Sequence, residues 1–425
     1  MGEDSSTVLG TATRGLSAHA PVMLSLNDRR RHVHLIGRTG TGKTTTLRTM
    51  IYDDLRQGRG FALLDPLGGF ALDVVDVIPP KRNDETIYFD PSDLGHVIAF
   101  NPLDRVPRDQ RHLVADHIVA AFAHIWGASL ADTPRLVFVL YHSLRLLLDT
   151  PGTTLLGLPR LLVDDEYRAR LLRECEDPIV AGYWDNEFAQ YDAHFRTQVI
   201  APIQNKIGML LTGPIAKILG QPRSTIDIRR LMDEGGILIA RLSKGKIGSN
   251  ASHLLGAFLA TAISQVADAR SAEPGMPWRD FTLYADEVQN FATERFSGTL
   301  AEGRNGRLML VLAHQYLHQL PLSLQHAILA NCGSSIVFRI GAHDATVMAA
   351  ELGIESPQAL CDTANFFAWA RLLRDGFPDD PVLMETYLPE PPARGRAAAV
   401  IAHTRARHTR SREHVERIIE AQLWG

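Results

Sequence analysis

A glycine-rich motif at residues 37–44 has the residue types and spacing needed to bind phosphate groups. Its sequence, Gly-Arg-Thr-Gly-Thr-Gly-Lys-Thr, is that of a P-loop, in which glycines let backbone N–H groups approach phosphates closely. We expect Lys43 to reach the β- and γ-phosphates of a nucleoside triphosphate and Thr44 to hold Mg²⁺. The alternative is a chance glycine-rich turn, and agreement along the whole motif argues against it. The predicted nucleotide site comprises Gly37, Arg38, Thr39, Gly40, Thr41, Gly42, Lys43, Thr44 and Thr45.

Two acidic residues, Asp286 and Glu287, directly follow the apolar run 281–285. In a P-loop ATPase, an Asp at the end of such a strand holds Mg²⁺ through its water shell. The adjacent Glu is then placed to orient and deprotonate the attacking water. The alternative is a helix N-terminus at which two acids complement the helix dipole. Together with the P-loop, the pair predicts a hydrolytic site with Thr44 and Asp286 as metal ligands and with Glu287 and Lys43 as catalytic residues.

Three further polar residues follow or precede apolar runs. Gln315 comes just after the run 308–312, and beside the Asp286 strand its amide can sense the γ-phosphate and the water. The alternative is an amide that satisfies a loop backbone. Arg304 lies between the two strands and can stabilise charge on the transferring phosphoryl group across a subunit interface. Arg339, after the run 335–338, is a second candidate, and either arginine can instead be an ordinary surface residue.

Strands and helices must bring these residues together. A short apolar strand at 33–36 precedes the P-loop, and helix-forming residues follow from Thr45 to Leu55. Further strands are predicted at 61–64, 86–89, 236–240, 281–285, 308–312, 335–338 and 366–372, with one or two short ones at 7–9 and 22–26. Short apolar runs separated by helical segments are typical of a parallel α/β sheet.

The pattern changes from about 107 to 235, where helix-period apolar residues predominate. They predict helices at 111–126, 134–148, 164–174, 178–191 and 197–219, and another at 252–270 after the next strand. A proline-rich segment and a charged helical tail at 411–423 end the sequence. The expected division is a lead-in at 1–32, a nucleotide-binding domain from 33–106 and 236–380, an all-α insertion at 107–235 and a tail at 381–425.

The composition is that of a globular protein, with 45% hydrophobic and 22% charged residues. No run of about 18 apolar residues predicts a membrane span, and the first residues lack the pattern of a secretory signal. The three widely spaced cysteines fit neither a disulfide framework nor a metal cluster, and they predict a reducing cytoplasm. Among the 17 histidines no ligand spacing is found. We expect His32 at the surface, and His34 and His314 in packing roles.

A formal net charge of −4 argues against a basic nucleic-acid coat, although a ring or channel needs only a local basic stripe. Basic residues do cluster at 28–32 and near the C-terminus. The second cluster consists of Arg405, Arg407, Arg410 and Arg412. For each cluster the alternative is an ordinary solvated surface.

In these motifs the chain resembles the HerA/FtsK superfamily of ring-forming ATPases, and within it the type IV secretion coupling proteins, or conjugative DNA transfer ATPases. The resemblance extends from about 28 to 390 and depends on several motifs in one order. They are residues 28–32 leading into 37–44, then 65–66, 88–92, 99–103, 242–248, 286–293, 313–316, 338–341 and 344–345.

The resemblance implies a RecA-like P-loop NTPase motor domain with an inserted all-α domain. It also implies ATP and Mg²⁺ as cofactors, a homohexamer with nucleotide sites between subunits, and DNA in a central channel. By position, Arg304 matches the family's arginine finger, supplied in trans, and Gln315 matches its sensor. A relaxosome, a secretion channel or a nuclease is then an expected partner.

Two departures from the family pattern qualify this expectation. Members usually show Asp-Pro-His-Gly-Asp after the second strand, whereas this chain has Asp65-Pro66-Leu67-Gly68-Gly69. The missing His and acid predict slower or altered turnover. Membrane-anchored members also carry N-terminal transmembrane helices, which this sequence does not show. We therefore expect a cytoplasmic motor, or one that a partner recruits to the inner face of the membrane.

Three hypotheses follow for the function. The first is an ATP-driven DNA translocase, in which Lys244 and Lys246, made flexible by neighbouring glycines, are candidate channel-loop residues. The second is a motor for protein substrates. The third is a slow nucleotide-dependent scaffold that acts with a nuclease or another partner, which the departure at residues 67 and 69 favours. Single- and double-stranded DNA remain alternative tracks for the translocase.

Overall fold

The computed structural model describes residues 6–13, 19–127, 133–273, 275–293 and 296–424. The chain forms two compact units. The first comprises Met1–Phe89, Ile228–Ser243 and Ala260–His403, and the second comprises Asp90–Asp227, Lys244–Leu259 and Thr404–Gly425. The division expected from the sequence, with its insertion at 107–235, stays a prediction.

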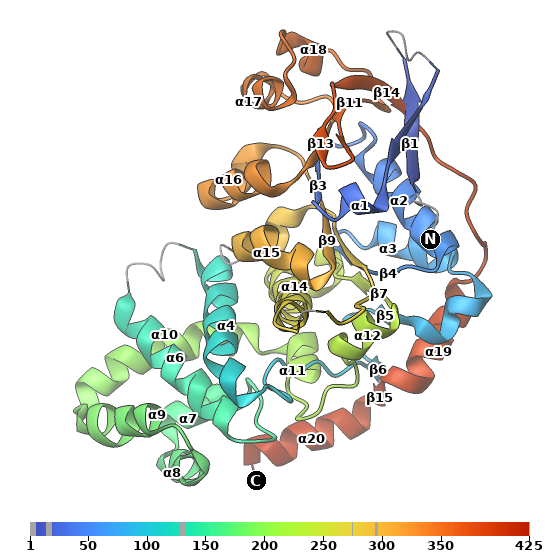
Figure 1. Ribbon diagram of the computed structural model, residues 1–425. Coiled ribbons are helices and arrows are strands. Elements are labelled where there is room, and N and C mark those ends of the chain that lie inside the picture. The colour runs from blue at the N-terminus through green and yellow to red at the C-terminus, as the bar shows by residue number, and fades with distance from the viewer. Residues whose placement is uncertain (1–5, 14–18, 128–132, 274, 294–295, 425) are drawn as a thin grey trace. The chain divides into compact units, whose positions relative to one another are not determined.

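Among the described residues, an 11-stranded sheet forms the centre of the first unit (Figure 1). The strand order is β2-β1-β14-β11-β10-β3-β9-β8-β4-β7-β5. Neighbouring strands from β10 to β5 run parallel, whereas β11, β14, β1 and β2 pair antiparallel. The strands are β1 (Thr7–Ala12), β2 (Pro21–Leu24), β3 (Val33–Ile36), β4 (Gly60–Asp65), β5 (Thr86–Phe89), β7 (Ile237–Arg241), β8 (Phe281–Ala285), β9 (Leu308–His314), β10 (Ser334–Val337), β11 (Phe367–Arg371) and β14 (Val382–Thr386).

Helices cover both faces of this sheet, with α2 and α3 on one side and α15 and α16 on the other (Figure 1). Successive side chains of a strand point to opposite faces of the sheet, so one strand can contribute to the core on both faces. Val33 and Leu35 pack with residues of α2, whereas Ile36 packs with residues of α17 (Ala342–Leu352) on the other face. The helices of the first unit are α1 (Leu26–Arg29), α2 (Lys43–Gln57), α3 (Gly69–Asp76), α12 (Ile228–Glu234), α15 (Phe296–Glu302), α16 (Leu322–Asn331), α17 (Ala342–Leu352) and α18 (Gln358–Cys361). The helix α19 (Ala397–His408) begins in this unit and ends in the second. A small hairpin pairs β12 (Leu373–Arg374) with β13 (Phe377–Pro378).

Both ends of the sequence contribute to the sheet. The strands β1 and β2 lie in the expected lead-in, and β14 lies at the start of the expected tail. β1 pairs with β14 at Gly10 and Thr386, far apart in the sequence. Apart from β11, the antiparallel strands therefore come from segments that we expected to flank the nucleotide-binding domain.

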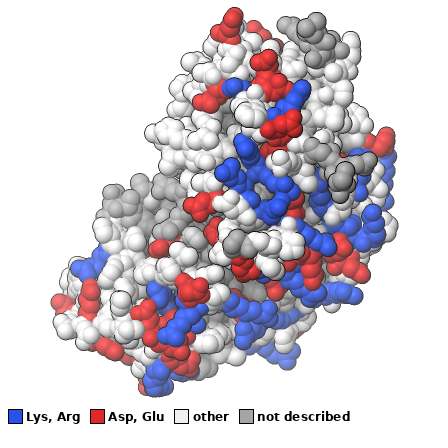
Figure 2. All heavy atoms as spheres, in the orientation of Figure 1, with Lys and Arg blue, Asp and Glu red and all other residues white. Residues whose placement is uncertain are grey.

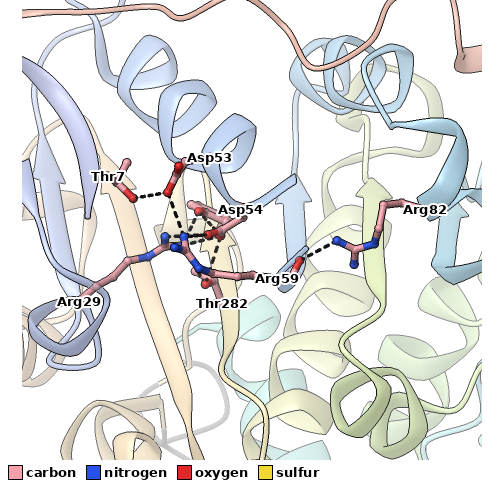
Figure 3. Close-up of polar contacts among 8 residues, drawn as sticks. Thr7, Arg29, Asp53, Asp54, Arg59, Arg82 and Thr282 are labelled. Atoms are coloured by element: carbon pink, nitrogen blue, oxygen red, sulfur yellow. Dashed lines mark hydrogen bonds and ion pairs between the residues drawn. The ribbon is translucent and has the colours of Figure 1, made fainter. Parts of the chain in front are cut away.

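A buried ion network joins the P-loop helix to the strand that precedes Asp286 (Figure 3). The Arg29 guanidinium donates to both carboxylate oxygens of Asp54, at 2.9 and 2.6 Å, and neither side chain is exposed. Tyr284 on β8 also donates to Asp54, at 2.7 Å. Arg59 extends the network to Asp54 and Asp53, each at 2.9 Å. The network holds α2 against β8, so it fixes the elements that carry the two halves of the candidate site.

We expect Asp54→Ala to lower the free energy of unfolding by roughly 3–5 kcal/mol, because it leaves the Arg29 charge buried without its main partner. Chemical denaturation followed by circular dichroism measures the change. Glu390→Ala is the matched control, since the Arg394–Glu390 pair is exposed and its loss costs at most about 1 kcal/mol. Equal effects of the two substitutions would contradict this account.

The second unit is mostly helical. Its helices are α4 (Arg111–Trp126), α6 (Pro134–Asp149), α7 (Gly157–Val163), α8 (Asp165–Glu174), α9 (Pro178–Gly182), α10 (Ala193–Leu210), α11 (Gly213–Leu219), α13 (Lys244–Ile247) and α20 (Arg412–Trp424). A short strand β6 (His96–Val97) pairs with β15 (Arg410–Ser411). The long helix α14 (Ser249–Ser271) begins in this unit and ends in the first. No helix within the described ranges is long and apolar enough to cross a membrane.

Two helices expected in this region differ from the prediction. The expected helix 197–219 is interrupted at Leu211 and Thr212, between α10 and α11. Pro214 explains the break, because proline lacks an N–H and disfavours helical geometry in the preceding residue. The expected helix 178–191 ends at Gly182 as an α-helix and continues as a π turn (Tyr183–Glu187) and a 3-10 turn (Phe188–Gln190).

Candidate active site

The P-loop connects β3 to α2, as the sequence predicts, and two of its glycines stand where a side chain would not fit. A Cβ atom on Gly37 would lie 2.5 Å from the Cβ of Phe338, and one on Gly42 would lie 2.7 Å from the Phe338 ring. Gly42 also has a φ of 127°, which side chains rarely tolerate. The buried Phe338 therefore supports the loop from below, and α2 begins at Lys43 with its N-terminal N–H groups directed at the loop.

Lys43 is buried, and its ammonium group donates to carbonyl oxygens of the loop itself. The acceptors are Gly37, and Arg38 at 3.3 Å. Burial lowers the pKa of Lys43, and the nearby Glu287 and Asp286 carboxylates raise it. A buried ammonium among weak neutral acceptors is suited to take phosphate oxygens as stronger partners. The loop therefore fits a nucleoside triphosphate.

The three strands that carry the motifs run in the same direction and end side by side. β3 pairs in parallel with β9, and β9 with β8, so the carboxyl ends of all three lie together. The Gln315 amide donates to one Glu287 carboxylate oxygen at 2.8 Å, and Gln289 donates to the other at 2.7 Å. The structure thus brings Gln315 and Glu287 into direct contact, beside Lys43. Gln289 is a partner that the sequence motifs did not single out.

Glu287 has an uncommon backbone conformation. Its φ and ψ are 54° and 56°, in the left-handed region, and its carbonyl accepts from the Asn290 amide at 2.7 Å. A non-glycine residue in this region costs of order 1 kcal/mol or more, and such residues concentrate at functional sites. The conformation ends β8 abruptly and directs the Glu287 side chain toward Gln315.

Asp286 lies among like charges. Burial, together with the carboxylates of Glu287 and Asp65, raises its pKa to about 7, while Lys43 lowers it. Asp65 ends β4, the other neighbour of β8, and accepts from the N–H groups of Leu67 and Ala71. The cluster carries negative charge that Lys43 offsets only in part, so it fits a divalent cation held by oxygen ligands.

Leu67 and Gly69 stand where the family pattern has a His and an acid. The Leu67 side chain is apolar and 68% exposed, so it adds no polar group to the site and points largely into solvent. Gly68 has a φ of 83°, and a Cβ there would lie 2.8 Å from the Cβ of Ser243. The turn therefore keeps the shape set by Gly68, while the residues on either side of it differ chemically from the pattern.

The two candidate arginines lie at opposite ends of the parallel strands. Arg304 is exposed in a 3-10 turn (Gly303–Gly306) that precedes β9, so the length of that strand, about 20 Å, separates it from Gln315. Arg339 follows β10 at the P-loop edge, where its carbonyl accepts from the Arg38 N–H at 2.9 Å. Its guanidinium donates to Asn365 at 2.7 Å. Arg304 cannot reach the P-loop of its own chain, whereas Arg339 lies beside it.

A stacked pair of buried histidines links β3 to β9. His34 and His314 have ring centroids 5.0 Å apart, and their Nε2 atoms are 2.8 Å apart. Because His314 Nδ1 lies 3.1 Å from the Tyr316 carbonyl, it carries the proton, and His34 donates to His314. Burial lowers the pKa of His314 to about 4 and that of His34 well below its usual range. The pair is therefore neutral, in the packing role expected.

The basic cluster at 28–32 is partly internal, which corrects the surface expectation for two of its residues. Arg29 is fully buried, and so is His32, which was expected at the surface. His32 Nδ1 accepts from the Leu310 N–H at 3.1 Å. Arg30 pairs with Asp280 at 2.8 Å, and Arg31 donates to the Gly376 carbonyl at 2.9 Å.

Basic side chains do gather on the surface near α1 (Figure 2). A hollow of about 430 Å³ is lined there by Arg30, Arg59, Arg279 and Arg307, with Asp280 among them. In the second unit, Arg405 pairs with Asp93, and Arg412 with Glu416, each at 2.8 Å. Lys244 and Lys246, which we expected in a flexible loop, belong to the short helix α13.

Comparisons with known proteins agree with this fold. A family model described as the type IV secretion-system coupling protein DNA-binding domain matches residues 16–360. A comparison with curated protein sequences gives no significant match. Among solved structures, the bacterial conjugative coupling protein TrwBdeltaN70 in its unbound form is similar, with a TM-score of 0.66 and 14% identity over 93% of this chain and 91% of that one.

Two further structures are similar over most of their length. TrwB in complex with the GTP analogue GDPNP has a TM-score of 0.67 and 16% identity, covering 93% of this chain and 98% of that chain. VirB4 of Thermoanaerobacter pseudethanolicus has a TM-score of 0.59 and 12% identity, with coverage of 92% and 98%. At these identities the likeness concerns the fold, and it confirms the α/β class expected from the sequence.

Proposed function

Because the chain belongs to the family of type IV secretion-system coupling proteins and carries the family's DNA-binding domain, we propose that it is an ATP-driven DNA translocase. The observation that carries the proposal is the contact between Gln315 and Glu287 beside Lys43. It brings together the three residues that we propose as phosphate-binding lysine, general base and sensor, at the carboxyl ends of the parallel strands. Related TrwB structures are described as complexes with ADP and Mg²⁺ and with an ATP analogue, which supports the choice of nucleotide.

Each residue has a defined task in this proposal. When the nucleotide binds, the Lys43 ammonium group donates to β- and γ-phosphate oxygens in place of the loop carbonyls. Thr44 and Asp286 hold Mg²⁺, which supplies charge neutralisation at the phosphates when bound. Glu287 accepts a proton from the attacking water. Gln315 donates to Glu287 through its nitrogen, so its carbonyl oxygen is the group that orients the water.

The family resemblance supports a ring, and the position of Arg304 is compatible with a role between subunits. We infer a homohexamer in which the Arg304 of one subunit completes the site of the next. The length of β9 between Arg304 and Gln315 favours this role in trans over one within the same chain. DNA then passes through the ring as the sites cycle. The proposed location is the cytoplasm, with recruitment to the inner membrane face by a secretion channel or relaxosome partner.

DNA stimulation of ATP hydrolysis tests the proposal. We expect the rate to rise when DNA is added at low salt and to fall as salt increases, because contacts to phosphates release counterions. Phosphate release is measured over a salt series with single- and double-stranded oligonucleotides, and a charge-matched heparin is the control for non-specific polyanion effects. An ATPase that neither binds nor responds to DNA at low salt would overturn translocation and would favour a protein substrate.

A slow nucleotide-dependent scaffold is the second candidate, and the residues at 67 and 69 favour it. Leu67 and Gly69 supply no polar group where the family pattern has a His and an acid. The expected signature is an assembly that forms with ATP but turns over slowly with or without DNA. Sedimentation with ATP, compared with the turnover rate in the same sample, distinguishes the two functions.

A further inference from the structure

Phe366 has an exposed side chain on a strained backbone. It was expected inside a strand at 366–372, but β11 begins one residue later, and Phe366 has a φ of 66°. A bulky residue in this left-handed region is a rare outlier. Its side chain is nonetheless 50% exposed, so burial of the ring does not compensate for the strain.

Hydrogen bonds to the P-loop hold this conformation. The Phe366 N–H donates to the Thr41 carbonyl at 2.7 Å. Its own carbonyl accepts from both the N–H and the hydroxyl of Thr386, each at 2.8 Å. A Cβ on Gly42 would lie 3.3 Å from the Phe366 Cα. The backbone at Phe366 thus lies in close contact with the phosphate-binding loop. Backbone strain from an unfavourable φ is common where a protein holds a ligand.

The strand order places Phe366 at the nucleoside end of the site. Glu287 and Gln315 define the γ-phosphate end, and they follow β8 and β9, on one side of β3. β10 and β11 lie on the other side of β3. A triphosphate bound along the P-loop with its γ-phosphate near Gln315 therefore directs its nucleoside toward β10 and β11. Phe366, just before β11, lies on that side.

We propose that the Phe366 ring is the surface on which the nucleobase stacks. This inference rests on the proposed function, because it names the base-binding part of the same site. A phenyl ring stacks on any base but forms no hydrogen bond to its edge, so it favours purines without separating adenine from guanine. The P-loop contact of the Phe366 backbone keeps the ring at a fixed position relative to the phosphates.

The test compares ATP with tripolyphosphate, which has the phosphates but no base. Phe366→Gly removes the ring and suits the positive φ, so it relieves strain rather than adding it. We expect the Kd for Mg²⁺–ATP to rise roughly tenfold, with the tripolyphosphate Kd unchanged, both by calorimetry. Phe366→Trp should retain ATP affinity, and its fluorescence should respond to ATP but not to tripolyphosphate. Phe377→Ala, which removes another exposed ring, is the control.

The outcomes separate the inference from the function on which it rests. If the wild-type chain binds ATP and Phe366→Gly binds it equally well, the stacking role is wrong and the proposed function stands. If Phe366→Gly weakens ATP and tripolyphosphate equally, Phe366 only supports the loop, and the inference is again wrong. If the wild-type chain binds neither ligand, the proposed function fails and the inference fails with it.

Discussion

Glu287→Gln should lower the rate of ATP hydrolysis by roughly two to four orders of magnitude, the usual contribution of a general base. The substitution preserves the size of the side chain and one of its two acceptor oxygens, so the contact with Gln315 can persist while that with Gln289 is lost. It removes the group that takes the proton from water. Nucleotide affinity should therefore stay within a few-fold of the wild-type value, since Lys43 and the P-loop amides are unchanged.

Single-turnover hydrolysis together with ATP binding by calorimetry measures the two quantities separately. Glu355→Gln is the matched control, because it makes the same chemical change at an exposed position outside the site. Loss of ATP binding in Glu287→Gln would show that the left-handed conformation of Glu287 has collapsed, rather than that a base is missing. Near-normal hydrolysis would shift the base to another carboxylate, with Asp286 as the nearest.

That Lys43, Glu287 and Gln315 lie together could be predicted, because the signals in the sequence are local. Each of Lys43, Asp286 and Gln315 directly follows a short apolar strand or its turn, and parallel strands of one sheet end at one edge. The sequence therefore indicated which residues would meet, without any knowledge of the register. The contact of Gln315 with Glu287 required only that β8 and β9 be neighbours, which the structure confirms.

The conformation of Phe366 and the buried network could not be predicted in this way. Phe366 looks like a strand residue, and its conformation is set by hydrogen bonds to Thr41 and Thr386, both distant in sequence. Arg29 looks like part of a solvated basic cluster, and it is buried because Asp54 and Tyr284 converge on it from two other elements. In both cases partners distant in the sequence determine the conformation. By local tendency alone, a pair of Phe residues would lie in a strand and a cluster of Arg residues would be exposed.

Arg304→Ala should reduce ATP hydrolysis by about 10³-fold or more, the effect of losing an arginine finger, with little change in ATP affinity. The reason is geometric. Arg304 precedes β9 and Gln315 follows it, so the two residues lie at opposite ends of this strand. If Arg304 contacts a transferring phosphoryl group, that group belongs to another subunit. Arg307→Ala, which alters a partly exposed arginine near the same turn, is the control.

Mixing two inactive variants gives the sharper form of this prediction. Arg304→Ala subunits retain an intact Glu287, and Glu287→Gln subunits retain an intact Arg304. In mixed rings, some interfaces join an intact base to an intact finger from the neighbour, so hydrolysis should recover on mixing. A finger that acts within one chain predicts no recovery at any ratio. Activity retained by Arg304→Ala alone would instead point to Arg339, which already lies beside its own P-loop and would then act on the nucleotide of its own subunit.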